Sequence, residues 1–412
     1  MFKWYCLHQG QAILIAIILA GISGIVLPQV FSYLGFIGNI FINLLKLCAL
    51  PVIFTSLVVT IGLLPELKQL GRIAGNTVIY IVASEIIAVT IGLVVFNLVD
   101  ISQNINGVAL LSGASYIPTA TTNISPNQIF NYIFTSNIFE SFAKFDILPI
   151  VTFSIMFGLT CTLKREAAAP MLNFFVSARE IFLTLLNGIM YLAPFAIFVL
   201  IGSAVAQSYL TGALAINLLG LIKFVGLFFV ALFIHCLWQL LLVAYLYRHL
   251  SIKRILTEAI PIFVTAFISS SSLATLPIAL EKAEQLGGNK KVVEFMLPIC
   301  AAMNFASGMM YEMVAALFFL HILGVHPGLI EQILLAIVCI LTGIAVGGIP
   351  ETSMVSFVTV FNMAHIPLAA ISILLPLDRV VDRVRTMANV FCNTCGTLIV
   401  SKTKINFREK NE

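Results

Sequence analysis

The stretch LLPLDRVVDRVRTMANVFCNTCGTLIV, residues 374–400, places five charged side chains within eight positions between two apolar segments. If this stretch is a helix that spans a membrane, each charge at the centre of the bilayer costs about 2.5–3.5 kcal/mol. The charged groups must therefore pair with one another or line a polar site. We expect a ligand site, and an ion-pair lattice that joins helices is the alternative. At about 100° per residue, one helix face carries Asp378, Asp382, Arg385, Asn389 and Asn393, and Arg379, Arg383 and Thr386 lie beside it.

The composition indicates a membrane protein. Of the 412 residues, 60% are hydrophobic and only 10% are charged, and the mean hydropathy is +1.07. The net charge of +4 is scattered along the chain, which argues against a nucleic-acid partner. The eight cysteines lie mostly in apolar runs without disulfide spacing, and we expect buried thiols. No catalytic motif of a metalloprotease, serine hydrolase or phosphate-binding loop occurs in the sequence, so we do not expect an enzyme.

Windows of about 20 apolar residues predict membrane spans in the first half of the chain. Lys and Arg gather in alternate connecting segments, whereas the segments 31–35, 101–137 and 208–215 contain neither. Because basic residues accumulate in cytoplasmic loops, both ends of this half are predicted to face the cytoplasm. The six predicted spans are 11–30, 37–64, 74–99, 138–163, 183–207 and 216–247.

The second half of the chain contains interrupted apolar segments. Residues 255–285 have a serine run at their centre and basic residues on both sides, which predicts a re-entrant hairpin that enters from the cytoplasm. A span over 292–323 is broken by NFASG. A second hairpin over 329–366 has GGIPETS at its centre and enters from outside, and 368–401 is the charged span. This inverted repeat is typical of secondary transporters, whereas ordinary spans kinked by Ser, Gly and Pro are the alternative.

Taken together, these segments predict an all-α polytopic membrane protein of eight transmembrane helices and two re-entrant helical hairpins. Both termini are expected in the cytoplasm, in a plasma membrane or a bacterial inner membrane. On the charged span, arginine offers a paired N–H fork to a carboxylate, and aspartate accepts hydrogen bonds from an ammonium group. The charged face therefore suits a zwitterion that carries an additional carboxylate.

At this point the sequence resembles the dicarboxylate/amino acid:cation symporter family, which includes the glutamate and aspartate transporters. The resemblance covers nearly the whole chain and implies a homotrimer in which a transport domain moves like an elevator against a fixed scaffold, with no cofactor other than a coupling ion. The motifs that carry it are LKLCALPVIFTSLVVTI, DILPIVTFSIMFGL, YLAPFAIFVLIGSAVA, TAFISSSSLATLP, YEMVAALFF, GGIPETS and DRVVDRVRTMANV.

The resemblance also implies a division of the chain into domains. The scaffold comprises the first two spans and, after an extracellular loop, the fourth and fifth spans. The transport domain comprises the third span, the sixth span and the core with both hairpins. The implied boundaries are 1–70 and 101–215 for the scaffold, 71–100, 216–250 and 251–403 for the transport domain, and 404–412 for a cytoplasmic tail.

The family's substrate ligands carry over to matching positions of this sequence. Arg385 resembles the residue that holds the side-chain carboxylate of the substrate, and Asp382 resembles the acceptor for its amino group. Together they favour an acidic amino acid, with neutral amino acids and C4-dicarboxylates as alternatives. The complete set implied for substrate binding is Ser271, Ser272, Gly348, Pro350, Asp382, Arg385, Thr386 and Asn389.

Two further positions are expected to modulate the site. Arg383 lies where the animal excitatory transporters of the family have an arginine. Glu351 at the outer hairpin tip is a departure that puts the binding of an acidic substrate in doubt, and so is Leu273 in place of a serine at the inner tip.

The sodium sites of the family are incomplete in this chain. Asn304 is retained in NFASG, but Ala306 occupies a carboxylate position, and Asn393 replaces a second carboxylate near the end of the last span. A hard cation that lacks carboxylates must rely on carbonyl and amide oxygens. The residual sodium-ligand candidates are Asn304, Asn389, Asn393 and Ser84.

Two glutamates could carry coupled protons in place of sodium ions. Glu312 matches a position at which animal members carry the coupled proton, and Glu85 replaces a small hydroxyl residue in the third span. A carboxyl group buried in the membrane can bind and release a proton near neutral pH. Proton coupling is therefore our prediction and sodium coupling the alternative. The lost acids also leave open a member that does not transport and serves as a receptor or scaffold, or that conducts ions.

Overall fold

The computed structural model describes residues 15–63, 67–99, 134–144, 147–212, 214–346 and 352–402, and these residues form helices joined by turns, with no strand among them. An apolar helix, Ile15–Val26, comes first. The labelled helices follow it in the order α2 (Pro28–Gly62), α3 (Leu67–Leu98), α6 (Ile138–Lys144), α7 (Ile147–Leu163), α8 (Arg165–Met190), α9 (Ala193–Leu210), α10 (Leu214–Leu246), α11 (Ile252–Ser269), α12 (Ser272–Gln285), α13 (Lys290–Met303), α14 (Ala306–Ile322), α15 (Leu329–Val346), α16 (Thr352–Met363) and α17 (Ala369–Lys402).

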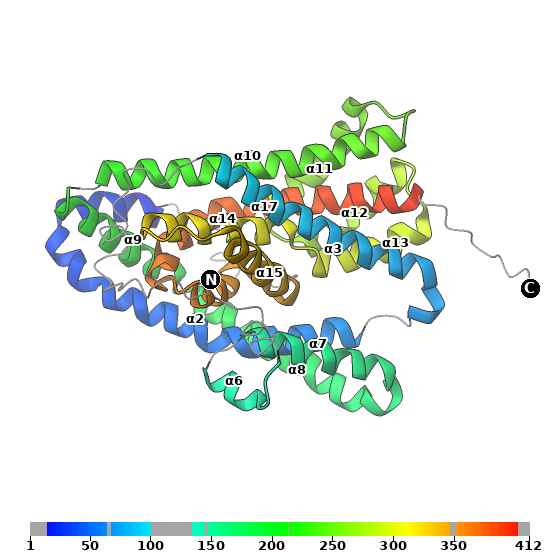
Figure 1. The fold of residues 1–412 in the computed structure, drawn as a ribbon, viewed down its shortest axis with the longest axis horizontal. Coiled ribbons are helices and arrows are strands. Elements are labelled where there is room, and N and C mark those ends of the chain that lie inside the picture. The colour runs from blue at the N-terminus through cyan, green and yellow to red at the C-terminus, as the bar shows by residue number, and fades with distance from the viewer. Residues whose placement is uncertain are drawn as a thin grey trace, which may run out of the picture.

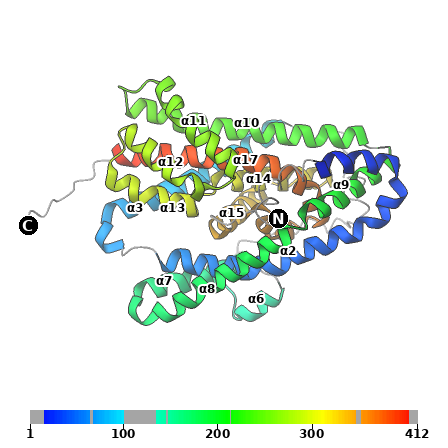
Figure 2. The same cartoon turned by 180° about the vertical axis from the view of Figure 1, so that it is seen from behind.

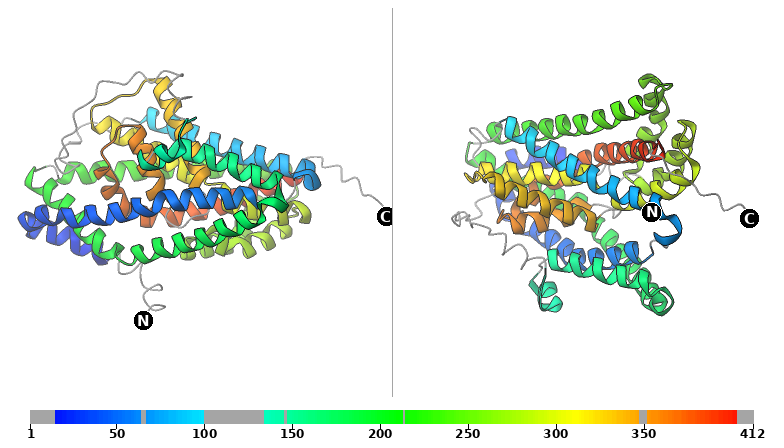
Figure 3. Two further views of the ribbon diagram at one scale, coloured as in Figure 1. Left: turned by 90° about the horizontal axis from the view of Figure 1, so that it is seen from below. Right: turned by 45° about the vertical axis from the view of Figure 1, so that its right-hand side comes forward.

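The helices form two packed groups with α14 and α17 between them. Helix α2 packs against α7, α8 and α9 along one side, whereas α10 and α11 run along the other side (Figures 1 and 2). Most of the long helices run along the long axis of the molecule (Figure 3). Helix α14 is buried over nearly its whole length and contacts α3, α10, α15, α16 and α17. The most enclosed part of the described fold is therefore the second half of the broken span.

The described helices fit a multi-pass membrane protein. Four of them are long and apolar enough to cross a membrane by length and composition: Ile73–Leu98, Arg165–Leu186, Asn217–Leu246 and the broken Lys290–Ile322. Large apolar side chains also cover the outside, including Phe36, Phe139, Phe174 and Ile222, each more than half exposed. Exposed apolar surface on this scale suits lipid as the surrounding solvent.

Two predicted span boundaries are wrong. The predicted gap at 31–35 lies inside α2, because the chain breaks at Leu27 and Pro28 begins the next helix at its first position. The predicted fifth span over 183–207 joins parts of two helices, since α8 ends at Met190 and α9 begins at Ala193. Charged residues at the start of α8, Arg165 and Glu166, lower the mean hydropathy there, so residues 165–182 fall outside the predicted spans.

The inner helical hairpin is formed by α11 and α12. Ser270 ends α11 in the left-handed conformation, with φ of 49°, and Ser271 caps the start of α12 by accepting a hydrogen bond from the backbone N–H of Ala274 at 3.2 Å. The two helices pack against each other, and Lys282 and Glu258 form an ion pair of 2.9 Å between them. The sequence therefore placed this turn correctly at the serine run.

The two other predicted interruptions differ in what the structure describes. The broken span divides at Asn304 and Phe305, between α13 and α14, as NFASG predicted. Helices α15 and α16 pack together as the arms of the second hairpin. Its predicted tip residues Gly348, Pro350 and Glu351 lie outside the described residues.

Candidate ligand and ion site

Arg385 on α17 is the centre of a buried charge cluster. Its side chain is fully buried, and its Nη2 donates hydrogen bonds to Asp378 Oδ1 at 2.6 Å and to Asp382 Oδ1 at 2.9 Å. The guanidinium carbon also lies 4.8 Å from the ring centroid of Tyr311 and 5.8 Å from that of Phe305. Paired carboxylates and aromatic faces both stabilise a buried cation. The charges on this helix face are thus paired in part, and the expected ligand site stays a prediction.

Two of the three guanidinium nitrogens of Arg385 take no part in this pairing. Neither Nε nor Nη1 of Arg385 has a hydrogen-bond acceptor among the described residues, although both atoms are buried. Buried donors in folded proteins are nearly always hydrogen-bonded, and a cation that lacks acceptors is especially costly. A lattice that only joins helices would be expected to satisfy these donors. The free N–H groups instead favour a site for an anionic ligand.

Two other predicted ligands of α17 lie beside Arg385. Thr386 and Asn389 are both buried. Asn389 Oδ1 accepts a hydrogen bond from the backbone N–H of Ser307 at 3.0 Å, and Ser307 Oγ donates to the backbone carbonyl of Arg385 at 3.1 Å. These bonds attach the N-terminal end of α14 to α17. The break between α13 and α14 is thus held directly against the charge cluster.

The inner hairpin contacts α17 through Arg383. The Nη1 of Arg383 donates to the backbone carbonyl of Phe267 at 3.1 Å and lies 3.5 Å from that of Ile268, at the C-terminal end of α11. Cations favour helix C-termini, where carbonyl groups lack partners within the helix. Ser272 follows as the first residue of α12, and a helix N-terminus favours anions. Arg383 therefore connects α17 to the end of α11, and its modulating role stays a prediction.

The predicted residual sodium ligands are not equivalent. Asn304 Nδ2 donates to Asn393 Oδ1 at 2.7 Å, and Asn389 Oδ1 accepts from Ser307 as described above, so both acceptor oxygens already receive a hydrogen bond. By contrast, Asn304 Oδ1 and Ser84 Oγ are buried and have no hydrogen-bond partner among the described residues. The structure thus separates the four candidates into two occupied oxygens and two unpartnered ones.

The two predicted proton-coupling glutamates are both fully buried but have different surroundings. Ser356 on α16 donates a hydrogen bond to Glu312 Oε1, whereas Glu312 Oε2 has no partner among the described residues. Glu85 lies near the backbone N–H of Phe305 at the helix break. Neither of its oxygens makes a hydrogen bond of normal geometry with the described residues. Glu312 thus lies within α14 and contacts α16, whereas Glu85 on α3 lies near the N-terminal end of α14.

Sequence reasoning missed several residues of this region. Asp378 was recognised as part of the charged face but not as the shortest ion-pair partner of Arg385. The spacing of seven residues places both on one helix face and could have suggested the pair. Ser307, Tyr311 and Ser356 come from other helices, so no sequence pattern on α17 could have identified them.

Tyr80 forms a second connection to α17. Its hydroxyl lies 2.7 Å from Gln239 Oε1 and donates to the backbone carbonyl of Cys392 at 2.8 Å. Its ring lies against Gly396, where an added Cβ would come within 1.9 Å of the ring. Ser84 and Glu85 follow one turn later on α3, so this contact fixes the segment that carries them.

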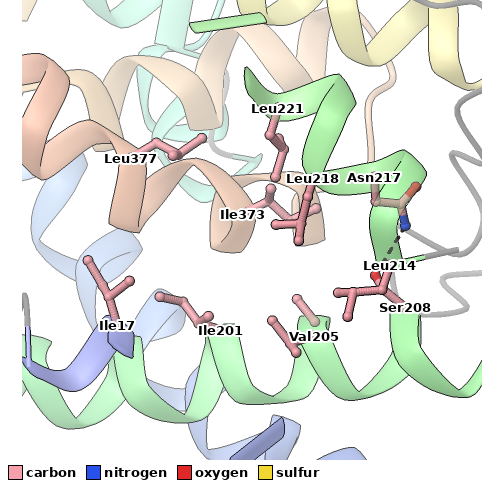
Figure 4. Close-up of a pocket in the computed structure, with 11 residues that line it drawn as sticks. Ile17, Ile201, Val205, Ser208, Leu214, Asn217, Leu218, Leu221, Ile373 and Leu377 are labelled. Atoms are coloured by element: carbon pink, nitrogen blue, oxygen red, sulfur yellow. Dashed lines mark hydrogen bonds between the residues drawn. The ribbon is translucent and has the colours of Figure 1, made fainter. Parts of the chain in front are cut away.

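A separate cavity of about 180 Å³ lies between the first helix, α9, α10 and α17. Figure 4 shows apolar side chains such as Ile17, Ile201 and Leu377 around it. Its polar residues Ser208 and Asn217 bond to each other at 3.1 Å. The residues that line the cavity do not include the charged residues of α17, so it does not provide the chemistry that the Arg385 cluster offers.

The chain is similar in sequence to known proteins. A family model described as the sodium:dicarboxylate symporter family matches residues 10–403. The chain is 30% identical over 405 residues to a proton/sodium-glutamate symport protein of Geobacillus stearothermophilus, an alignment that covers 97% of this chain and 95% of that protein. It is 29% identical to the proton/glutamate-aspartate symporter of Escherichia coli (90% and 86% covered). It is 27% identical to a C4-dicarboxylate transport protein of Bacillus subtilis (96% and 94% covered).

Proposed function

Because this chain belongs to the sodium:dicarboxylate symporter family, we propose that it is a secondary active symporter that takes up an acidic amino acid, glutamate or aspartate, together with protons. The chain is a multi-pass membrane transporter and not an enzyme. The observation that carries the substrate proposal is the buried Arg385 guanidinium, whose Nε and Nη1 lack acceptors among the described residues while two aspartates hold Nη2.

Each charged part of an acidic amino acid has a partner of complementary chemistry in this site. The side-chain carboxylate binds the Arg385 guanidinium, and the ammonium group donates to Asp382, which is more exposed than Asp378. The α-carboxylate binds at the hairpin tips, where Ser271, Ser272 and the N-terminus of α12 lie on the inner side. Thr386 and Asn389 complete the site from α17. Gly348 and Pro350 contribute the outer tip, with Glu351 beside them.

A plain C4-dicarboxylate fits this arrangement less well. It lacks an ammonium group, so Asp382 would keep only Arg385 as its cationic partner while it lies next to the incoming anion. Like charges this close together are costly in a desolvated site. Neutral amino acids lack the acidic side chain that would use Nε and Nη1 of Arg385, which have no acceptor among the described residues. An acidic amino acid is therefore the better match, although relatives of the chain include a C4-dicarboxylate transport protein.

The ion site supports protons over sodium. Ala306 and Asn393 offer no carboxylate, and the side-chain oxygens of Asn389 and Asn393 already accept N–H hydrogen bonds. A sodium ion prefers oxygen ligands that are free to coordinate it, as hard cations generally do. Glu85 and Glu312 are buried groups that can each carry a proton, and each has at least one oxygen that lacks a partner among the described residues.

We further propose that transport proceeds by an elevator movement within a homotrimer in the plasma membrane, or in the inner membrane of a bacterium, with both termini in the cytoplasm. The scaffold comprises 1–70 and 101–215, and the transport domain comprises 71–100, 216–250 and 251–403. Close helix packing supports a rigid scaffold, because an added Cβ at Gly38 would lie 2.2 Å from Leu200 and one at Gly202 would lie 2.2 Å from Phe31. These contacts join α2 to α9.

Uptake into proteoliposomes tests the proposed function. Purified protein should accumulate labelled glutamate or aspartate against a gradient, and succinate and a neutral amino acid should accumulate much less. Empty liposomes and liposomes with denatured protein serve as controls. Accumulation of succinate alone would overturn the amino-acid assignment. Binding without accumulation would indicate a receptor or scaffold, and ion currents without substrate uptake would indicate a channel.

A further inference from the structure

The two aspartates that hold Arg385 differ in their surroundings. Both accept a hydrogen bond from the same nitrogen, Nη2, and Asp378 makes the shorter contact, 2.6 Å against 2.9 Å. The Asp378 side chain is 6% exposed and that of Asp382 is 24% exposed. Asp382 is therefore more accessible to a ligand than Asp378, and its second oxygen, Oδ2, can accept from a ligand N–H group while Oδ1 stays on Nη2. The two hydrogens of Nη2 are both in use.

The geometry of guanidinium makes this occupation important. A carboxylate binds arginine most strongly through two parallel N–H bonds from neighbouring nitrogens. One such fork combines Nη1 with Nη2, and the other combines Nε with Nη2. Both forks include Nη2, because the free hydrogens of Nε and Nη1 point in different directions. A ligand carboxylate can thus form a two-point contact with Arg385 only when one aspartate leaves Nη2.

We infer that Asp378 is an internal competitor for the ligand carboxylate and lowers the affinity of the site for acidic substrates. This inference rests on the proposed function, since it assumes that Arg385 binds the acidic side chain of the substrate. Asp382 has a second task, because it accepts hydrogen bonds from the substrate's ammonium group. Asp378 has no such cationic partner in the substrate, so its negative charge opposes the incoming carboxylate and also offers Arg385 an alternative partner.

The competitor role gives Asp378 a function in substrate release. A buried arginine that lost its ligand without another acceptor would remain an unpaired charge, which is strongly unfavourable. Asp378 supplies that acceptor from the same helix, seven residues away. The exchange of one carboxylate for another on Nη2 lets the substrate leave without an uncompensated cation. Asp378 is thus a specificity-determining residue that lowers the affinity for the acidic substrate and speeds its release.

Matched asparagine variants test the inference. Asp378→Asn and Asp382→Asn each remove one negative charge from the same nitrogen of Arg385 while the side chains keep their size. Calorimetric titration of purified protein with glutamate should show that Asp378→Asn binds glutamate about five- to tenfold more tightly than wild type, since a neutral amide competes less well than a carboxylate. Asp382→Asn should bind glutamate at least about tenfold more weakly, because the ammonium loses a charged partner.

The outcomes separate the inference from the proposed function. Weaker or unchanged glutamate binding by Asp378→Asn, with wild-type protein that binds normally, would overturn only the competitor role and indicate that Asp378 orients Arg385. A wild-type protein that binds no acidic amino acid would overturn the proposed function itself. Thermal unfolding and size-exclusion chromatography report whether each variant is folded.

A structure of wild-type protein with bound glutamate provides a second test that needs no variant. The competitor role predicts that Arg385 Nη2 donates to the glutamate carboxylate and that Asp378 lies beyond hydrogen-bond distance from it. Retention of the 2.6 Å contact with glutamate bound to both Nη1 and Nη2 would overturn the inference.

Discussion

Two regions around α14 differ in how their charges are satisfied. Around Arg385, each carboxylate has a partner: Asp378 and Asp382 hold the guanidinium, and Ser356 donates to Glu312. Near Phe305, neither oxygen of Glu85 makes a hydrogen bond of normal geometry with the described residues, and Asn304 bonds to another amide. The charged groups of the first region are thus paired with one another, whereas the carboxylate of the second region has no such pairing.

The two regions bear on different parts of the proposed function. The proposed substrate ligands include Asp382 and Arg385 of α17, which are paired with each other. The proposed ion ligands come from α3, α14 and α17, and there Ala306 and Asn393 offer no carboxylate while Glu85 adds one. The proposed change from sodium to protons follows from the second region and leaves the first unaltered.

Arg385→Ala should have the largest effect. Removal of the guanidinium leaves the acidic side chain of the substrate without its partner and the two aspartates without theirs, a loss of roughly 2–5 kcal/mol. Uptake of labelled glutamate should fall to background, and thermal unfolding with size-exclusion chromatography reports whether the variant protein is folded. Unchanged glutamate uptake would show that the substrate carboxylate binds elsewhere.

Glu312→Gln should abolish the dependence of glutamate uptake on the proton gradient. Glutamine resembles the neutral acid in shape and can still interact with Ser356, so substrate exchange, which needs no proton cycle, should remain. Net uptake driven by an inward proton gradient should fall at least about tenfold, the equivalent of 1.4 kcal/mol. Exchange of labelled for unlabelled glutamate provides the control. Normal gradient-driven uptake by this variant would exclude Glu312 as the coupling group.

Glu85→Gln tests whether the Glu85 carboxylate carries a coupled proton, and it should have a smaller effect than Glu312→Gln. If Glu85 carries a coupled proton, the variant should lose a part of the pH dependence or bind glutamate about tenfold more weakly, again about 1.4 kcal/mol. The matched control is Ser84→Ala, which removes the neighbouring unpartnered oxygen and leaves the carboxylate. Lower expression with normal coupling in the remaining protein would assign Glu85 a structural role.

Gly396→Ala should have the smallest effect, and it tests the packing of α17 against Tyr80, one turn before Ser84 and Glu85 on α3. An added Cβ would lie 1.9 Å from the ring of Tyr80, so Tyr80 must move away from its contacts with Gln239 and Cys392. Overpacking of this kind typically costs about 1–3 kcal/mol. The thermal unfolding temperature should fall. Gly75→Ala on α3 is the control, because a Cβ there meets no atom within 4 Å, and an equal decrease in both variants would contradict the packing argument.

The sequence predicted the fold well where charge and turn residues marked the interruptions. The serine run located the turn between α11 and α12, and NFASG located the break between α13 and α14. The spans predicted from hydropathy missed the first part of α8, which begins with Arg165 and Glu166. They also misplaced the start of α2, where Pro28 rather than a polar loop divides the helices.

The candidate site was predicted unevenly for a physical reason. Helix periodicity relates residues on one helix, so the face of Asp378, Asp382 and Arg385 could be recognised from spacing alone. It carries no information on partners from other helices, and the contacts of Ser307 and Ser356 depend on how those helices pack against α17 and α14. The division of the residual sodium ligands into occupied and free oxygens also depends on that packing.

The ion dependence of uptake tests the central claim most directly. Labelled glutamate uptake into proteoliposomes should be measured with an inward proton gradient and with an inward sodium gradient imposed separately, at a fixed membrane potential. The account predicts that the proton gradient drives accumulation and that replacement of sodium by choline barely alters it. Steep sodium dependence at constant pH would contradict the account and would mean that amide and backbone oxygens around Asn304 and Asn393 suffice to bind the ion.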